Sequence, residues 1–440
     1  MTELYKKFIE HPVITTDSRD CPEGSIFFAL KGDTFNGNAY AKAALDKGCA
    51  YAVIDEAQYA EDDRYIVVDD VLTTLQQLAR EHRRALGTPI IGITGTNGKT
   101  TTKELIATVL SKKYNVLYTQ GNFNNHIGVP KTLLRLTKEH EIAVIEMGAN
   151  HPGEIKTLVE IVEPNCGLIT NVGKAHIEGF GSFEGVIKTK GELYDNLRKR
   201  ADSKVFIDTE NPYLMGISEG LNLVPYVKGE VTACDPFLRF KWSSKEDSYR
   251  STEGAYRSGE ATYRSEAYRY EVQTHLIGAY NMKNMLAAAT VGLHFGVTPE
   301  QINEALSGYV PSNNRSQLTV TEHNKLIVDT YNANPTSMMA ALNNFVLMSV
   351  EPKMAILGEM GELGSISHEE HQKIINFLQE HHIENVWLVG KVFGKIESPY
   401  RKFADVNEVK EALTTERPDG QYILIKGSNY NRLFELPPLL

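Results

Sequence analysis

A glycine-rich loop that ends in a lysine and threonines carries the strongest chemical signal in this sequence of 440 residues. A largely apolar run at 90–94 leads into the loop, and apolar residues at helical spacing follow it as far as residue 110. Glycines allow main-chain N–H groups to converge on phosphate oxygens, and the start of a helix adds a favourable dipole. Lys99 can then reach the β- and γ-phosphates, and the Thr100 hydroxyl can bind Mg²⁺. The pattern predicts a nucleoside triphosphate site, although Ile93 stands where the usual loop has its first glycine.

A nucleotide site alone leaves two classes of function open. A GTPase-like switch would change conformation, whereas an enzyme would use ATP to make a bond. Guanine-binding proteins usually carry Asn-Lys-x-Asp, and the nearest match, at residues 324–327, has isoleucine in place of the aspartate. The other polar clusters favour the enzyme.

Three further polar residues lie near the ends of expected strands or in an expected helix. Glu146 ends an apolar strand pattern, at the edge where open α/β sheets bind ligands, and its carboxylate can hold Mg²⁺ together with Thr100. An ordinary surface glutamate fits the same pattern. His176 also follows an expected strand, and Lys190 lies in a helical pattern. Taken alone, a histidine of this kind is more often structural, and such a lysine is ordinarily a solvated residue on a helix.

Composition and charge restrict the class of protein. Lysine plus arginine number 46 and aspartate plus glutamate number 56, and the resulting net charge of −10 argues against a nucleic-acid partner. No apolar run approaches the ~18 residues of a membrane helix, and the first residues lack the apolar segment of a signal peptide. The four cysteines show no paired spacing, which predicts reduced thiols. We therefore expect a cytoplasmic protein with no membrane partner, and a monomer by default.

The elements that position these residues predict an α/β fold in three parts. Residues 1–86 form the first part, a small α/β unit that ends before Gly87-Thr-Pro89. Residues 87–310 alternate strands and helices, which predicts a parallel sheet with crossover helices. After a second break near Pro311-Ser-Asn-Asn314, the alternation resumes through residues 311–440. We expect strands at 25–30, 50–54, 90–94, 142–145, 167–170, 204–207, 325–328, 354–357, 385–389 and 422–425.

One tract does not fit this alternation. Residues 249–270 repeat Tyr-Arg-Ser from Tyr249, Tyr256 and Tyr263, at a seven-residue period. The repeating residues are not apolar pairs and glycines interrupt them, so we expect a low-complexity insertion, either a long β-hairpin or a loop, rather than a coiled coil. We assign the tract no catalytic role.

Several longer segments together resemble the Mur ligase family. They lie at 92–104, 121–130, 146–154, 171–180, 275–284, 331–335 and 358–364. Within the family, the chain is similar to the ligases that add D-alanyl-D-alanine to UDP-N-acetylmuramoyl-tripeptide (UDP-MurNAc-tripeptide). The resemblance implies a three-domain architecture with a central P-loop ATPase domain and a Rossmann-like C-terminal domain. It also implies that the N-terminal domain binds the UDP-sugar, the central domain ATP, and the C-terminal domain the incoming amine.

The resemblance further implies a role for each matching residue. ATP binding is implied for Gly95, Thr96, Asn97, Gly98, Lys99, Thr100, Thr101, Asn281, Asn284, Arg315 and Asp329. Substrate binding is implied for Asp17, Ser18, Arg19, Asn122, Asn124, Asn125, Tyr331, Asn332 and Asn334. Two Mg²⁺ ions are implied, held by Thr100, Glu146, His176 and a carbamylated Lys190. A direct part in catalysis is implied for Lys99, His176, Lys190, Arg315 and Asp329.

The implied reaction is ATP-driven amide formation through an acyl phosphate. One alternative is a family member that adds a single amino acid, but the Asp-Asn-Pro-Arg tetrapeptide typical of one such relative is absent. Another is a nucleotide-gated binding module without catalysis. The sequence also departs from the family pattern, because Asn429 replaces an arginine after Lys426-Gly-Ser428, and Arg432 is a candidate to supply that charge.

Overall fold

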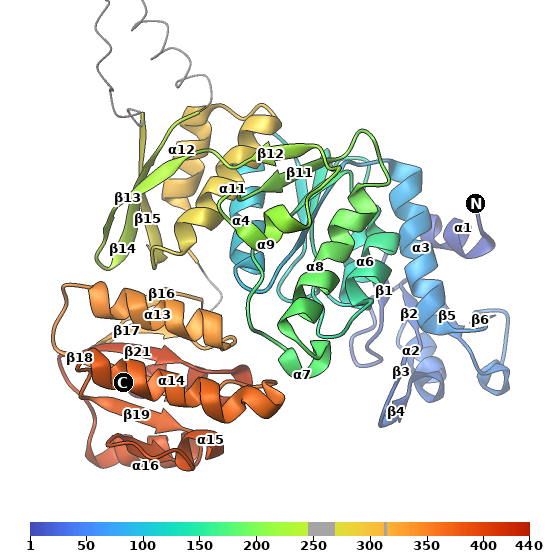
Figure 1. Cartoon of the computed structure of the whole chain (residues 1–440). Helices are drawn as coiled ribbons and strands as arrows, with labels where there is room; N and C mark the ends of the chain where they lie inside the picture. Colours follow the sequence, from blue (N-terminus) through green and yellow to red (C-terminus); the bar gives the residue numbers. More distant parts are fainter. Residues whose placement is uncertain (245–268, 312–314) are drawn as a thin grey trace, which may run out of the picture.

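The computed structural model describes residues 1–244, 269–311 and 315–440. Its elements form three lobes, which follow one another along the chain (Figure 1). The prediction for the Tyr-Arg-Ser tract falls on residues that lie, up to residue 268, outside the described part of the chain. Among the described residues, we find no helix with the length and apolar character needed to span a bilayer.

The N-terminal lobe is a parallel sheet of order β1-β2-β5-β6. Its elements are α1 (Glu3–Glu10), β1 (Ile14–Thr15), β2 (Ile26–Phe28), α2 (Ala41–Asp46), β5 (Tyr51–Ile54), β6 (Tyr65–Val67) and α3 (Val71–Leu86), with a short ribbon of β3 (Lys31–Gly32) and β4 (Phe35–Asn36). Helix α3 begins at its cap Asp70 and ends where Gly87 adopts a φ of +69°. The Arg83 guanidinium donates to the carbonyl oxygens of Val162 and Glu163, which fixes α3 against the central lobe.

The central lobe is built on a parallel sheet of order β12-β11-β10-β7-β9-β8. Its strands are β7 (Ile90–Thr94), β8 (Val116–Tyr118), β9 (Ile142–Glu146), β10 (Cys166–Ile169), β11 (Lys204–Ile207) and β12 (Leu223–Pro225). Helices of this lobe are α4 (Lys99–Leu110), α5 (Gly128–Leu133), α6 (Glu154–Val162), α7 (Ile177–Phe180), α8 (Phe183–Leu197) and α9 (Pro212–Gly216). The register pairs Ile93 with Glu146 and Thr94 with Ile169, so the carboxyl ends of β7, β9 and β10 meet at one edge.

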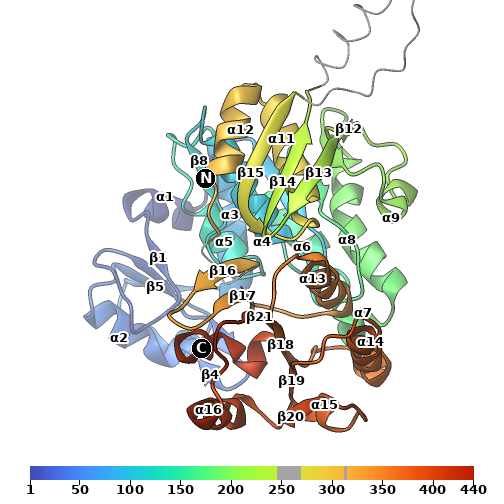
Figure 2. The same cartoon turned by 90° about the vertical axis from the view of Figure 1, so that its left-hand side faces the viewer.

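An antiparallel sheet, which the sequence did not predict, joins this lobe. It consists of β13 (Gly229–Cys234), β14 (Phe237–Trp242) and β15 (Tyr270–Ile277), and it packs on α11 (Asn281–His294) and α12 (Pro299–Gly308) (Figure 2). Every second residue of β14 is buried, at Leu238, Phe240 and Trp242. These side chains share a core with α4 and α11, which explains why the sheet folds against the nucleotide-loop helix.

The C-terminal lobe is a mixed sheet of order β16-β17-β21-β18-β19-β20 in which only the β16 edge is antiparallel. The strands are β16 (Gln317–Val320), β17 (Lys325–Asp329), β18 (Lys353–Gly358), β19 (Val386–Val389), β20 (Arg401–Phe403) and β21 (Tyr422–Lys426). Helices α13 (Pro335–Leu347) and α14 (Ser367–Glu380) pack on one face with Leu424, and α16 (Val406–Thr415) packs on the other with Ile423 and Ile425. A short α15 (Lys391–Gly394) follows β19. Because successive side chains of β21 point to opposite faces of the sheet, the lobe has a hydrophobic core on each face, as in other parallel α/β sheets.

Candidate active site

The loop after β7 is held in a fixed shape by main-chain bonds to the loop after β10. Thr96 N–H donates to the Asn171 carbonyl oxygen at 2.9 Å, and Asn97 N–H donates to Asn171 Oδ1 at 3.0 Å. A Cβ on Gly95 would clash with Thr170 Oγ1, so a side chain at that position would push the two loops apart. The neighbouring residues thus hold this loop as a preformed cradle at the start of α4. Loops of this geometry bind phosphates.

Lys99 turns back over this cradle. Its Nζ donates to the Gly95 carbonyl oxygen at 2.8 Å and to the Thr96 carbonyl oxygen at 3.0 Å. Burial lowers the pKa of Lys99 to about 8, and the nearby Glu146 carboxylate opposes that shift. A phosphate in the cradle would replace these carbonyl contacts with ion pairs to its oxygens.

Glu146 and Thr100 meet where the family resemblance places Mg²⁺. Glu146 is 1% exposed, and its Oε1 accepts from Thr100 Oγ1 at 3.3 Å and from Asn124 Nδ2 at 2.8 Å. Its Oε2 is buried and accepts no hydrogen bond. An orphaned carboxylate oxygen beside a hydroxyl suits a hard divalent cation. The described residues contain no group of three or more histidine, cysteine, aspartate or glutamate side chains able to hold a metal.

Lys190 and His176 both lie against the Phe180 ring, but they make different polar contacts. Lys190 is 2% exposed on α8, its Nζ donates to the Ala149 carbonyl oxygen at 3.0 Å, and it lies over the Phe180 ring. Burial, assisted by the positive charge of Lys99, lowers the pKa of Lys190 well below its usual value. The His176 ring instead contacts the Glu362 carboxylate of the C-terminal lobe. The sequence pattern alone also fits a solvated lysine on a helix, but Lys190 is buried.

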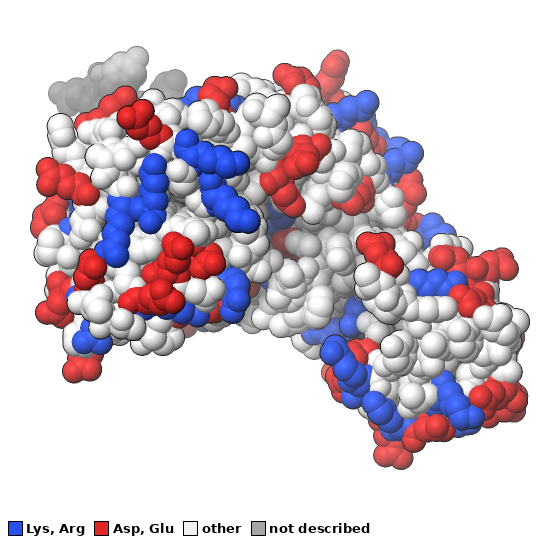
Figure 3. Space-filling view, turned by 90° about the horizontal axis from the view of Figure 1, so that it is seen from below, with Lys and Arg blue, Asp and Glu red and all other residues white. Residues whose placement is uncertain are grey.

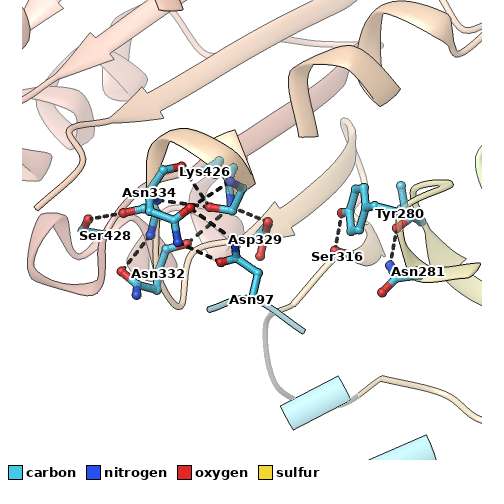
Figure 4. Close-up of polar contacts among 12 residues, drawn as sticks. Asn97, Tyr280, Asn281, Ser316, Asp329, Asn332, Asn334, Lys426 and Ser428 are labelled. Atoms are coloured by element: carbon cyan, nitrogen blue, oxygen red, sulfur yellow. Dashed lines mark hydrogen bonds and ion pairs between the residues drawn. The ribbon is translucent and has the colours of Figure 1, made fainter. Parts of the chain in front are cut away.

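The C-terminal lobe contributes a second face (Figure 4). Lys426, at the end of β21, is 1% exposed and pairs with Asp329, at the end of β17, at 2.5 Å. The Arg315 guanidinium lies 3.8 Å from the centre of the Tyr331 ring, and its Nε is buried without a hydrogen-bond partner. This face therefore holds two cations and one carboxylate opposite the phosphate loop.

Asn281 and Asn284 begin helix α11 beside the loop. Asn284 Oδ1 accepts from Thr102 Oγ1 at 3.1 Å, and its Nδ2 donates to Asn281 Oδ1 at 2.9 Å. Just before them, Tyr280 bonds the Ser316 hydroxyl at 2.6 Å (Figure 4). These contacts link α11 to both the phosphate-loop helix and the start of the C-terminal lobe.

The two faces enclose a cavity of about 800 Å³, and the molecule is visibly hollowed between the lobes when seen from below (Figure 3). Helix α3 reaches it through Leu72 and Gln76. The expected site residues that line it are Thr96, Asn97, Gly98, Lys99, Thr100, Thr101, Asn122, Asn124, Asn125, Glu146, His176, Asn281, Asn284, Arg315, Asp329, Tyr331 and Asn332. Most of the expected site is therefore brought together around one space.

Six expected residues do not line the cavity. Gly95, Lys190 and Asn334 lie behind its wall, in contact with residues that do. Asp17, Ser18 and Arg19 belong to the N-terminal lobe and are not part of the lining. There, Arg19 donates to both carboxylate oxygens of Asp17 and holds the pKa of that carboxyl well below its usual range. The side chain of Lys131 reaches this segment through Thr16 at 3.3 Å.

Lys426 and Asn171 were not predicted as site residues. Arg432 was a candidate to replace the missing arginine, but it does not line the cavity. Arg432 pairs with Glu435 at the surface and lies outside the lining. Lys426 lines the cavity, and its position at the carboxyl end of an apolar strand was an available signal. Asn171 lies just after the carboxyl end of β10, another apolar strand, so its position was an available signal as well.

Comparison with known proteins decides the family. Residues 12–83 match the model for the Mur ligase family catalytic domain, residues 93–292 the Mur ligase middle domain, and residues 314–429 the Mur ligase glutamate ligase domain. The chain belongs to the Mur ligase family.

Individual Mur ligases resemble the chain over nearly its full length. It is 32% identical to the UDP-N-acetylmuramoyl-tripeptide–D-alanyl-D-alanine ligase of Bacillus subtilis, over 98% of this chain and 93% of the relative. It is 33% identical to the ligase of the same name from Escherichia coli, over 97% and 93% of the two chains. Among solved structures, MurF from Acinetobacter baumannii superposes with a TM-score of 0.83 at 28% identity, covering 96% of this chain and 92% of that one. The Mur ligase fold and the three-part architecture expected from the sequence are confirmed.

Proposed function

We propose that the chain is an ATP-dependent ligase that joins D-alanyl-D-alanine to UDP-MurNAc-tripeptide in peptidoglycan precursor synthesis. The observation that carries this proposal is the single cavity in which the phosphate loop and Glu146 lie opposite Arg315, Asp329 and Lys426. Two relatives named for this reaction, each about a third identical over nearly the whole chain, support the choice of substrates. The structure of a Thermotoga maritima MurF ligase in complex with ADP shares the fold, with a TM-score of 0.84 at 24% identity over 100% of this chain and 98% of that one.

Amide formation needs an activated carboxyl group. In the first step a carboxylate oxygen of the tripeptide bonds to the γ-phosphorus, the bond to the β–γ bridging oxygen breaks, and ADP leaves. In the second step the amine bonds to the carbonyl carbon, the bond from that carbon to the phosphate oxygen breaks, and the amine proton leaves with inorganic phosphate. Both steps depend on positioning and charge stabilisation more than on covalent work by the protein.

The residues of this chain supply that stabilisation. The loop N–H groups and Lys99 would bind the phosphates, and Arg315 from the opposite lobe would stabilise the charge that develops in transfer. Thr100 and Glu146 would hold Mg²⁺, which neutralises charge on the phosphates when bound. Closure of the C-terminal lobe would exclude water from the acyl phosphate and so prevent its hydrolysis.

We also propose that Lys190 carries a carbamate. Its buried amine has a lowered pKa, so a neutral amine is available to bond CO₂ with loss of one proton. The product is an anion with two oxygen acceptors, which together with His176 would suit a second Mg²⁺. Bicarbonate enriched in ¹³C should give a carbamate signal that persists in Lys188→Ala, the exposed lysine two residues away, and disappears in Lys190→Ala. A signal that follows Lys188 would overturn the assignment.

The remaining roles divide between the lobes. We propose domains at 1–86, 87–310 and 311–440, with the UDP-sugar held by Asp17, Ser18, Arg19, Asn122, Asn124 and Asn125 and the amine by Tyr331, Asn332 and Asn334. Because Asp17–Arg19 do not line the cavity, a UDP-sugar would extend from it toward the N-terminal lobe. We further propose that the chain acts as a monomer in the cytoplasm.

Product mass is the direct test of this function. The chain is incubated with ATP, Mg²⁺, UDP-MurNAc-tripeptide and D-alanyl-D-alanine, and a parallel reaction offers UDP-MurNAc-dipeptide with lysine or diaminopimelate. We expect tripeptide plus dipeptide minus one water, with ADP formed in equal amount. Product only in the parallel reaction would identify a different Mur ligase, and ADP release without amide would favour a nucleotide-gated module.

A further inference from the structure

A reciprocal pair of side-chain amides joins the phosphate loop to the C-terminal lobe. Asn334 Nδ2 donates to Asn97 Oδ1 at 2.7 Å, and Asn97 Nδ2 donates to Asn334 Oδ1 at 3.4 Å. The two side chains point toward one another from different lobes (Figure 4), although their residues lie 237 positions apart in sequence. The bond thus joins the ATP-binding loop directly to the opposite face.

Asn97 is fixed on its own side. Its N–H donates to Asn171 Oδ1, and its carbonyl oxygen accepts from Thr170 Oγ1 at 2.6 Å and from Asn171 Nδ2 at 3.0 Å. Because both main-chain groups of Asn97 are held, the position from which its side chain projects is set by the phosphate loop.

Asn334 is fixed equally well. It is 4% exposed and caps helix α13, because its Oδ1 accepts from the Ser337 N–H at 2.9 Å. Two residues earlier, the Asn332 carbonyl oxygen accepts from Lys426 Nζ at 3.3 Å, the same amine that pairs with Asp329. The Asn334 side chain is therefore tied to the charged face of the C-terminal lobe as well as to its helix.

The first turn of α13 makes a second contact of the same kind. Lys174 N–H, in the loop after β10, donates to Thr336 Oγ1 at 3.2 Å. A single turn of the C-terminal lobe thus touches both loops that shape the phosphate cradle. This arrangement makes the position of the lobe depend on the shape of the cradle.

We propose that Asn97 and Asn334 are positioning residues that couple nucleotide in the phosphate loop to closure of the C-terminal lobe. Neither side chain needs to touch the reacting atoms: their bond places Arg315, Asp329 and the amine opposite the γ-phosphate. The inference rests on the proposed function and adds to the ATP- and substrate-binding roles that the family resemblance implied. Since coupling between two ligands is reciprocal, nucleotide should strengthen amine binding through this pair, and its loss should weaken that effect.

The chain offers a variant that separates positioning from helix capping. Serine caps helices about as well as asparagine but is too short to reach Asn97, so Asn334→Ser keeps the cap and removes the bridge, together with the amine contact proposed for Asn334. We expect it to leave the melting temperature and the ADP dissociation constant near wild type, while kcat/KM for the amine falls about tenfold, the value of one or two neutral hydrogen bonds. The loss should appear in KM more than in kcat.

A control removes a helix cap without touching the bridge. Asp405 caps α16 at the far side of the C-terminal lobe through the N–H groups of Asn407 and Glu408. Asp405→Ala should lower the melting temperature and leave the amine KM unchanged. If Asn334→Ser instead lowers stability as Asp405→Ala does and leaves the amine KM unchanged, Asn334 is only a cap and the proposal is wrong.

A charge-introduction cycle tests the contact itself. Asn97→Asp and Asn334→Asp each leave one carboxylate facing one amide, whereas the double variant brings two carboxylates together. Each single change lowers activity by itself, for example because a carboxylate at residue 97 repels the triphosphate. The double-mutant cycle subtracts these separate effects. We expect the double variant to lose at least about tenfold more amine kcat/KM than the product of the two single effects. Additive effects would overturn the proposal.

A measurement without substrate distinguishes this inference from the proposed ligase activity. Hydrogen exchange of the main-chain amides at 336–340 is followed with and without ADP. Wild type should exchange more slowly at the start of α13 when ADP is bound, and Asn334→Ser should lose most of that protection. If ADP slows exchange equally in wild type and in Asn334→Ser, the coupling is contradicted even when ligation is observed. If ADP slows exchange only in wild type, the coupling is supported even when the enzyme uses a different amine substrate.

Discussion

The two faces of the cavity are held in different ways. The phosphate-loop face belongs to one sheet edge, where main-chain bonds from Thr96 and Asn97 to Asn171 set its shape. The C-terminal face consists of side chains, chiefly the Asp329–Lys426 pair and the Arg315–Tyr331 stack, and reaches the loop across a lobe boundary. The first face is complete within the central lobe, whereas the second acts only when the C-terminal lobe is correctly placed.

This difference predicts two patterns of mutational effect. Changes to Lys99 on the phosphate-loop face should impair ATP chemistry while the fold stays intact, because its side chain lines the cavity and bonds only to its own loop. Changes on the C-terminal face should affect stability and amine use together, because buried Lys426 pairs with the largely enclosed Asp329 where two strands end. Mutations on each face can separate the two patterns.

Removing one partner of the buried ion pair should have the largest effect. Lys426→Met leaves the Asp329 carboxylate without its cation, and uncompensated buried charges cost about 3–5 kcal/mol of unfolding free energy. The double variant Asp329→Asn/Lys426→Met should recover much of that loss in urea unfolding but remain poor in ligation. If Lys426→Met unfolds at the wild-type urea concentration, the C-terminal face is not held by this pair.

Lys99→Ala should leave stability intact and remove turnover. A preorganised charge at a transferring phosphoryl group is worth on the order of 10² in rate or more, and the bonds that Lys99 makes are to its own loop. Steady-state ADP formation checks the rate, and thermal melting checks the fold, with Lys138→Ala as an exposed control. Near-normal turnover in Lys99→Ala would place the phosphate site elsewhere.

Acidification should destabilise both the junction of the first two lobes and the C-terminal lobe. Burial lowers the pKa of His82, which bonds Tyr5 and the Leu136 carbonyl oxygen, and of His371, whose Nε2 accepts from Met360 N–H. The unfolded chain therefore binds more protons than the folded one, so stability present above about pH 6.5 is lost as pH falls toward the folded pKa values. Each histidine contributes at most about 1.4 kcal/mol per pH unit.

Chemical unfolding between pH 7.5 and 5 tests this dependence. His371→Gln should lower stability at neutral pH and reduce the slope of stability against pH, since the titrating group is gone. A wild-type protein that becomes more stable as pH falls through this range would show that the two histidines are not buried in their neutral forms.

The smallest effect is expected for an exposed contact between the lobes. Lys174 Nζ pairs with Glu370 at 3.0 Å, but the lysine side chain is 47% exposed and Glu370 keeps a second partner in Lys373. Lys174→Ala should therefore change stability by less than about 1 kcal/mol, and high salt should remove the difference. An amine kcat/KM effect as large as that of Asn334→Ser would mean that closure depends on this pair and not on the amide bridge.

The sequence was most informative where signals are local. Ile90–Thr94, the loop and α4 form a continuous pattern, and β9 and β17 fall within a residue of their expected bounds. The pairing of β14 with β15 was missed because the tract at 245–268 separates the two strands in sequence, and the residue pattern of one strand does not show which strand it pairs with. The role of Lys426 was missed because its partner Asp329 lies 97 residues earlier and only the β17–β21 register brings them together.

The site residues were found from motifs, but their arrangement required the fold. Arg315 and the phosphate loop lie in separate lobes, so no spacing in the sequence places them across one cavity. Conversely, Asp17–Arg19 match the family pattern but do not line the cavity. A motif gives the types and order of residues, and it does not show where the fold places them.

The fate of one oxygen atom tests the central claim most directly. UDP-MurNAc-tripeptide labelled with ¹⁸O in its reacting carboxyl group is ligated with ATP and D-alanyl-D-alanine, and the inorganic phosphate is examined by mass spectrometry. If the cavity transfers the γ-phosphoryl group to that carboxylate, the phosphate must carry one ¹⁸O for each amide formed from fully labelled substrate, and the other nucleotide product must be ADP. Unlabelled phosphate, or AMP with pyrophosphate, would contradict the acyl-phosphate route and the arrangement of the two faces proposed for it.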